Sequence, residues 1–184
     1  MKRLALLYGA MLLFAGLASA QDEAPKIEAF GGYSFLRVNP GYSAPSLNFN
    51  GGSGSLAYNL TPMFGIVGDF GGYHWSPTGA DATVVTYMFG PKAALRHGPF
   101  TPFVQALFGG AHLSGSCNLD GCGGGSTTQN AFAMAVGGGL DWNATEHIGI
   151  RVVQAEYLLT RFGVVNPTDT QNNVRISTGV VFRW

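Results

Sequence analysis

Hydrophobic residues alternate with small or polar residues along most of the chain beyond residue 26. A period of two is the pattern of a β-strand whose faces meet different environments, because successive side chains point to opposite sides. The alternation recurs in eight segments, which span residues 27–36, 53–59, 64–71, 85–96, 101–111, 131–142, 151–159 and 173–184. The sequence therefore predicts eight strands.

The two faces of these segments differ in a consistent way. In the first segment Ile27, Tyr33 and Phe35 share one face, whereas Glu28 and Ser34 share the other. Across the segments, charged residues lie with the small residues and large aromatic residues lie on the opposite face. This arrangement is typical of strands that contact lipid with their apolar face and fill a narrow interior with the other face.

The fifth and seventh segments are the least regular. In the fifth, we expect Gln105 inside and Val104, Ala106 and Phe108 outside. In the seventh, Arg151 and Glu156 have opposite parity, so both cannot point inward on a regular strand. Either a β-bulge resets the register or Arg151 lies at a membrane interface. The favoured register places Gln154 and Glu156 inside and three residues outside: Ala155, Tyr157 and Leu159.

Long and short connections alternate between the segments. The short turns are residues 59–62, 96–101 and 143–147, and the longer connections, rich in Gly, Pro, Ser, Thr and Asn, are residues 37–48, 74–82, 112–130 and 162–172. This spacing predicts an all-β fold, an eight-stranded antiparallel up-and-down transmembrane β-barrel. A soluble lipocalin-like carrier has a similar length but the reverse polarity, with polar residues outside and apolar residues inside.

Aromatic residues lie where the ends of the strands would meet the two membrane interfaces. Phe64, Trp142 and Trp184 lie at the ends joined by short turns. Tyrosine and tryptophan are enriched at such interfaces. The sequence predicts a second aromatic belt towards the long connections, formed by Phe35, Tyr73, Trp75, Tyr87, Phe132, Tyr157 and Phe162.

The composition agrees with a surface that meets lipid. Only 11% of the 184 residues are charged, against about 25% in a typical soluble domain, and the formal net charge is zero. The 46% hydrophobic content excludes a disordered chain, and the lack of a basic excess argues against binding to nucleic acid.

The N-terminus carries the three parts of a secretory signal peptide. Lys2 and Arg3 are followed by an apolar run over residues 4–17 and by the small residues Ala18-Ser19-Ala20. We expect residues 1–20 to be cleaved, which leaves residues 21–184 as the barrel domain. No later apolar run is long enough for a transmembrane helix.

The last residues resemble the assembly signal of outer-membrane barrels: a polar residue, glycine, two free positions and two hydrophobic residues separated by one. Thr178, Gly179, Phe182 and Trp184 match it. With the signal peptide and the segment Gly31-Gly32-Tyr33-Ser34-Phe35, the mature chain resembles the OmpA-like transmembrane barrel family.

This resemblance implies export through the periplasm to the outer membrane of a Gram-negative-type bacterium. The implied partners are outer-membrane lipid, lipopolysaccharide and the barrel assembly machinery. OmpA itself continues into a periplasmic peptidoglycan-binding domain. This chain stops at the barrel, so tethering to peptidoglycan is not expected of it.

Eight charged residues are predicted to point into the barrel, four of each sign. They are Glu28, Asp69, Lys92, Arg96, Asp141, Glu156, Arg175 and Arg183. Buried charges need partners, and an eight-stranded barrel is just filled by its side chains. We therefore expect a plug of paired charges, with a small ion-conducting pore as the alternative.

Cys117 and Cys122 lie in the longest predicted loop of an otherwise cysteine-free chain. Two cysteines in an exported protein favour a disulfide over free thiols. Their spacing is not that of a CxxC redox motif, and only Asp120 is close, so no metal site is expected. No cofactor is expected either.

One residue pair raises the question of catalysis. His112 and Ser114 share a strand face, as a base and a hydroxyl nucleophile would need to. Some outer-membrane lipid A deacylases use such a pair on a barrel, but the spacing pins no acid here. We therefore favour a structural or surface-interaction barrel whose four long connections contact a ligand, with a lipid-modifying enzyme as the alternative.

Overall fold

The computed structural model describes residues 24–39, 46–76, 80–117, 125–162 and 170–184. No helix among them is long and apolar enough to cross a membrane. These residues form eight strands: β1 (Ile27–Val38), β2 (Leu47–Asn59), β3 (Phe64–Trp75), β4 (Ala80–Ala94), β5 (Phe100–Cys117), β6 (Gly125–Asn143), β7 (Ile148–Thr160) and β8 (Gln171–Arg183).

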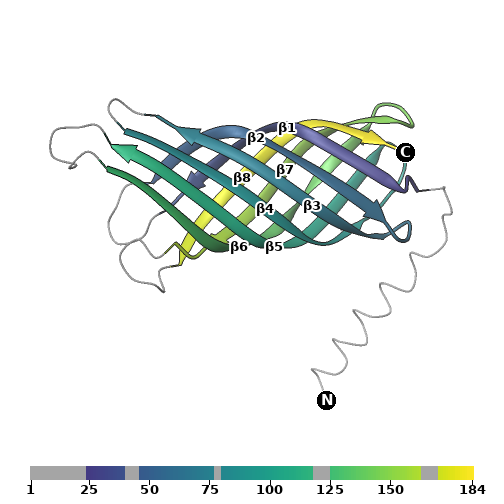
Figure 1. Ribbon diagram of the computed structural model, residues 1–184. Coiled ribbons are helices and arrows are strands. Elements are labelled where there is room, and N and C mark those ends of the chain that lie inside the picture. Colours follow the sequence, from purple (N-terminus) through teal and green to yellow (C-terminus); the bar gives the residue numbers. More distant parts are fainter. Residues whose placement is uncertain (1–23, 40–45, 77–79, 118–124, 163–169) are drawn as a thin grey trace, which may run out of the picture.

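Each strand pairs antiparallel with the strands before and after it, and β1 pairs with β8 to close the barrel (Figure 1). The predicted eight-stranded antiparallel up-and-down barrel is therefore confirmed. We call the end that carries Ile27, Trp184 and the turns after β2, β4 and β6 the turn end. The opposite end, where β1–β2, β3–β4, β5–β6 and β7–β8 are joined, is the loop end.

The predicted alternation holds along the strands, including the fifth. Outward side chains such as Leu56, Phe89 and Val104 are exposed, whereas inward ones such as Gln105 and Glu28 are buried. In a soluble protein, so much exposed hydrophobic surface would be a liability. The barrel is therefore apolar outside and polar inside over most of its height.

The seventh strand contains the bulge that the parity conflict suggested. The β7 register shifts against both neighbours, so Val152 and Val153 both face outward and are about half exposed. Arg151 is consequently buried in the interior, as are Gln154 and Glu156. The alternative that Arg151 lies at a membrane interface is wrong. Because two consecutive residues face outward, Arg151 before them and Gln154 after them can both point inward.

The strands run further towards the loop end than predicted. The β5–β6 ladder is continuous from Phe100↔Trp142 to Cys117↔Gly125, so most of the predicted connection 112–130 is strand. The connections 37–48, 74–82 and 162–172 also shorten, to residues 39–46, 76–79 and 161–170. Backbone pairing does not require a lipid-facing side chain, so the ladders continue beyond the apolar belt.

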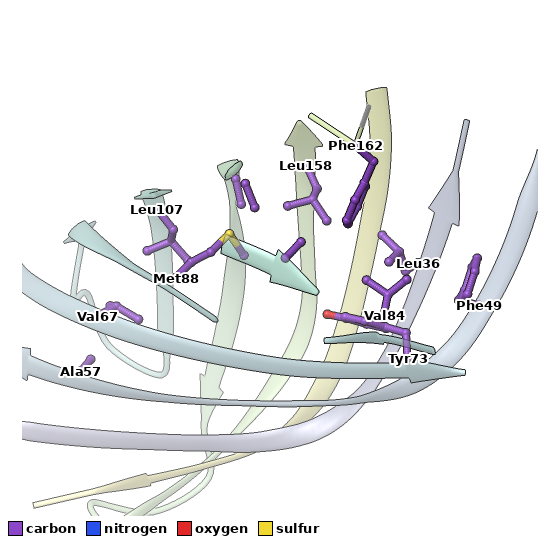
Figure 2. Packing of buried hydrophobic residues seen from close by; sticks show 13 residues of the cluster. Leu36, Phe49, Ala57, Val67, Tyr73, Val84, Met88, Leu107, Leu158 and Phe162 are labelled. Atoms are coloured by element: carbon purple, nitrogen blue, oxygen red, sulfur yellow. The ribbon is translucent and has the colours of Figure 1, made fainter. Parts of the chain in front are cut away.

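Polarity inverts in these extensions. At the loop end the outward positions are polar, among them Asn50, His74, His112 and Asn172. The inward positions are apolar and form a buried cluster that includes Leu36, Phe49, Val84, Leu158 and Phe162 (Figure 2). The predicted second aromatic belt is therefore partly wrong: Tyr73 and Phe162 are buried, and Trp75 packs against Phe49 inside.

One polar side-chain pair lies outside the barrel on each hairpin of the loop end. Tyr33 donates to Asn50 Oδ1 at 2.5 Å, and His74 Nδ1 lies 3.1 Å from Thr83 Oγ1. The other two pairs are His112 with Asn130 and Tyr157 with Asn172. We call these four pairs the exterior polar ring.

Glycine permits close approach at the seam that closes the barrel. Gly32 of β1 faces Gly179 of β8. A Cβ atom on Gly32 would lie 2.1 Å from the Thr178 carbonyl oxygen, and one on Gly179 would lie 2.3 Å from that of Gly31. No side chain fits at either position without backbone movement, so the tight seam depends on both glycines.

Candidate functional site

The buried charges of the interior form two clusters. The first surrounds Glu28 near the turn end. Its carboxylate accepts from Lys92 Nζ at 2.6 Å and from Arg96 Nη2 at 2.8 Å, and Arg183 Nε lies 4.0 Å away. Glu28 and Lys92 are each only 3% exposed. One carboxylate thus joins side chains from β1, β4, the turn after β4, and β8.

Asp141 extends this cluster to the other side of the barrel. Arg151 Nε donates to Asp141 Oδ1 at 2.8 Å, and Arg183 Nη2 lies 3.6 Å from Asp141 Oδ2. Arg183 also donates to the side chain of Asn143. Because Arg183 lies between Glu28 and Asp141, the turn-end charges form one connected network.

Two aromatic rings fill the space between these charges. The Arg151 guanidinium lies 4.2 Å from the centroid of Phe30 and 4.4 Å from that of Phe103. Lys92 Nζ lies 4.8 Å from the Phe103 centroid. A ring face attracts a cation, and the attraction is stronger away from water. The rings therefore close the lumen and help to compensate the desolvated cations.

The second cluster is centred on Arg175, which is fully buried. Its Nη1 donates to Asp69 Oδ1 at 2.6 Å, and its Nε donates to Glu156 Oε2 at 2.6 Å. The Tyr73 hydroxyl lies 3.2 Å from Arg175 Nη1, and Gln105 Nε2 donates to Glu156 Oε1 at 2.8 Å. One guanidinium thus holds two carboxylates from β3 and β7 in fixed positions, the geometry that a buried ion pair needs.

The structure places all eight predicted charges in these clusters, with Arg96 only partly buried. It adds Arg151, so the described interior network holds five basic and four acidic side chains rather than four of each. Arg151 was missed because the favoured register left its side chain unassigned. The parity conflict in the seventh segment was the signal that could have located it.

The two catalytic candidates, His112 and Ser114, both lie on the outer face at the loop end of β5. His112 Nδ1 is 2.7 Å from Asn130 Oδ1, and Ser114 is paired in register with Thr83 and Thr128. Within the described ranges no hydrogen bond joins His112 to Ser114, and no group of three His, Cys, Asp or Glu could hold a metal ion. Among the residues that the structure describes, Ser114 therefore has no hydrogen bond to a histidine that could activate it.

Some predicted features lie wholly or partly outside the described residues. The signal peptide, residues 1–20, is one of them. The disulfide is another, because Cys122 lies outside the described ranges although Cys117 ends β5. Both remain predictions.

The four residues of the C-terminal motif lie on or beside the closing seam. Phe182 and Trp184 face outward with ring centroids 6.3 Å apart, and Trp184 exchanges two backbone hydrogen bonds with Ile27, at 2.9 and 3.0 Å. Thr178 is exposed, and Gly179 occupies the close contact with β1. The motif therefore forms the end of the last strand and presents its aromatic residues at the turn end.

Comparison with known proteins identifies the fold. No family model matches the chain, and no curated protein matches it by sequence. Among solved structures, Ail, the attachment invasion locus protein of Yersinia pestis, superposes with a TM-score of 0.64 at 18% identity, covering 88% of this chain and 99% of Ail. Neisserial surface protein A gives 0.61 at 18% identity, covering 89% and 100%. The N-terminal β-barrel domain of Pseudomonas aeruginosa OprF gives 0.54 at 17%, covering 88% and 100%. The chain therefore has the fold of the small eight-stranded outer-membrane barrels, as the resemblance to OmpA-like barrels implied.

Proposed function

We propose that this protein is an integral outer-membrane barrel with a plugged interior, whose loop end contacts ligands outside the cell. The observation that carries the proposal is the continuous apolar exterior around an interior packed with paired charges. A soluble carrier would bury the apolar face instead. The apolar exterior thus supports a location in the membrane, and the paired charges of the interior support a structural role rather than a pore.

The height of the apolar exterior fits a bilayer. On β3 it extends from Phe64 at the turn end to Phe70, and the polar His74 follows. At about 3.3 Å per residue and a tilt of about 40°, His74, the first polar outward residue, lies about 25 Å from Phe64 along the barrel axis. The apolar side chains thus lie within the height of an outer-membrane apolar band. Exposed Phe100, Trp142 and Trp184 mark the turn-end interface.

The difference between the two ends supports the orientation. Both chain ends of the barrel and the short turns lie at one end, which we assign to the periplasm, because outer-membrane barrels have short periplasmic turns. The loop end then faces outward, and three of its four connections, residues 39–46, 118–124 and 161–170, are longer than any of the turns. Ail has been crystallised with the heparin analogue sucrose octasulfate, and this supports testing anionic saccharides as ligands of the loop end.

Labelling in intact cells tests location and orientation together. In a background with Cys117→Ser and Cys122→Ser, Ser46→Cys places a thiol at the loop end and Ala144→Cys places one in a turn-end loop; both positions are exposed. A maleimide carrying a large polymer should label Ser46→Cys in intact cells and Ala144→Cys only after the outer membrane is permeabilised. The reverse result would overturn the orientation, and the absence of protein from the outer-membrane fraction would overturn the function.

A further inference from the structure

The loop half of the interior contains a cavity that the plug does not fill. Its volume is about 250 Å³, and its walls come from seven of the eight strands and from Phe162. Leu36, Phe49, Val84 and Leu158, which line it, gather with Phe162 in Figure 2. The cavity lies above the Arg175 cluster, where the barrel extends beyond its apolar exterior.

Polarity in this part of the barrel is that of a soluble ligand carrier. The inward positions Val38, Leu47 and Leu113 are apolar, whereas the outward positions Asn50 and His74 are polar. Small soluble barrels with this polarity enclose apolar ligands. The prediction of a soluble lipocalin-like carrier is therefore wrong for the chain as a whole. The polarity it assumed, with polar residues outside and apolar residues inside, is nevertheless found at the loop end.

The cavity is closed on the side of the turn end. Tyr73 lies below it with its hydroxyl 3.2 Å from Arg175 Nη1, and Arg175 is fixed by Asp69 and Glu156. These side chains are all buried. The cavity is therefore a blind cup rather than a segment of a channel, so a molecule that enters it is held and not passed through.

One stripe of the wall is polar but uncharged. Asn173 Nδ2 donates to Thr160 Oγ1 at 3.0 Å, and Thr160 Oγ1 donates to Gln171 Oε1 at 3.3 Å. Of the described residues that line the cavity, none carries a charge. A buried charge without a partner is costly, so this wall suits a neutral ligand with one hydrogen-bonding group.

We propose that the cup binds a neutral, mainly apolar molecule with a single polar end, such as a medium-chain alcohol. A dry cavity of about 150 Å³ accommodates benzene, so by proportion 250 Å³ accommodates about ten non-hydrogen atoms. The apolar part lies against Leu36, Val84 and Leu158, and the polar end meets the stripe of Thr160, Gln171 and Asn173. This binding site is independent of the orientation proposed above and of any saccharide ligand.

Methyl-labelled protein in lipid nanodiscs, titrated with 1-nonanol, tests the proposal. Intermolecular NOEs should reach the inward methyl groups of Leu36, Val84 and Leu158. The outward methyl groups of Ile66 and Val104 report on ligand dissolved in the lipid. NOEs confined to the outward groups would overturn the proposal.

Two matched variants on β4 locate the site. Ala82 lines the cavity, whereas Ala93 lies on the opposite, lipid-facing side of the same strand. We expect Ala82→Phe to weaken nonanol binding at least about tenfold by occupying the cup, and Ala93→Phe to leave it unchanged. Heat-modifiable gel migration shows whether both variants are folded. Equal affinity of two folded variants would contradict the site.

The charge of the ligand tests its class. Nonanoate at neutral pH should bind at least about tenfold more weakly than nonanol, because none of the described residues that line the cup is a cation that could compensate its carboxylate. Equal or tighter binding of nonanoate would overturn the assignment to neutral ligands. Binding of neither molecule to the inward methyl groups would overturn the proposal as a whole.

Discussion

Arg175 and Asp69 are 106 residues apart in the sequence and 2.6 Å apart at the centre of the barrel. Asp69 lies on β3 and Arg175 on β8, two strands that are not paired with each other, so this contact crosses the lumen. Arg175 also pairs with Glu156 on the neighbouring strand β7. Pairing of neighbouring strands closes the barrel, and this ion-pair cluster braces it across the lumen.

We predict that Arg175→Met destabilises the barrel by about 3–5 kcal/mol, because it leaves Asp69 and Glu156 buried without their cation. Urea unfolding in detergent micelles, followed by heat-modifiable migration, measures the change. Adding Asp69→Asn and Glu156→Gln should recover much of the loss, since the uncompensated charges disappear.

Arg151→Met is the matched comparison. Asp141 keeps Arg183 at 3.6 Å when Arg151 is removed, and the interior loses its surplus cation. We therefore expect Arg151→Met to be clearly less destabilising than Arg175→Met. Equal losses for the two variants would show that the two clusters do not differ in the way their charge balance implies.

Two adjacent glycines in β1 should differ in their sensitivity to the same substitution. Gly32→Ala forces a Cβ atom against the Thr178 carbonyl oxygen and should cost about 1–3 kcal/mol, whereas Gly31 has open space around it and Gly31→Ala should change stability by less than about 0.5 kcal/mol. The same unfolding assay compares them. A seam that tolerates Gly32→Ala would mean that β1 and β8 are further apart than described.

The packed lumen predicts that the protein does not conduct ions. Purified protein in planar bilayers should show no steady conductance on the nanosiemens scale, because Phe30, Phe103 and the two charge clusters occupy the interior. A stable channel of that size in the wild-type protein would contradict the plug and favour the pore alternative.

Cys117 and Cys122 are expected to be oxidised in the exported protein. Labelling of the denatured, unreduced protein with a thiol reagent should detect no free thiol, and prior reduction should reveal two per chain. Two labelled thiols without reduction would contradict the predicted disulfide.

Alternation along the sequence predicted the strand count, the closed topology and the direction of nearly every side chain near the membrane. It did not predict where the strands end, because polarity inverts there: Phe49 and Val84 point inward beyond the belt, and Asn50 and His74 point outward. A rule that equates apolar with outward reads this stretch as loop.

The charges show a similar division. Parity predicted that Glu28, Asp69 and Arg175 point inward, but not which charges meet, because the partners depend on the stagger of strands around the closed sheet. The inward direction of the Arg151 side chain also depended on a β-bulge, and no residue type in β7 marks the position of that bulge. Its two valines would suit either face of an ordinary strand.

The exterior polar ring determines how far the barrel is immersed. If the barrel moved further into the membrane from the loop end, polar residues of the ring would enter hydrocarbon, namely His74, His112, Asn50 and Asn172. If it moved the other way, Phe70 and Phe89 would be exposed to water. Both displacements are unfavourable, so the depth of the barrel in the bilayer is fixed. In the orientation proposed above, the cup and the long β5–β6 hairpin then stand at a constant height above the hydrocarbon, and lipids of different thickness would adapt to the protein.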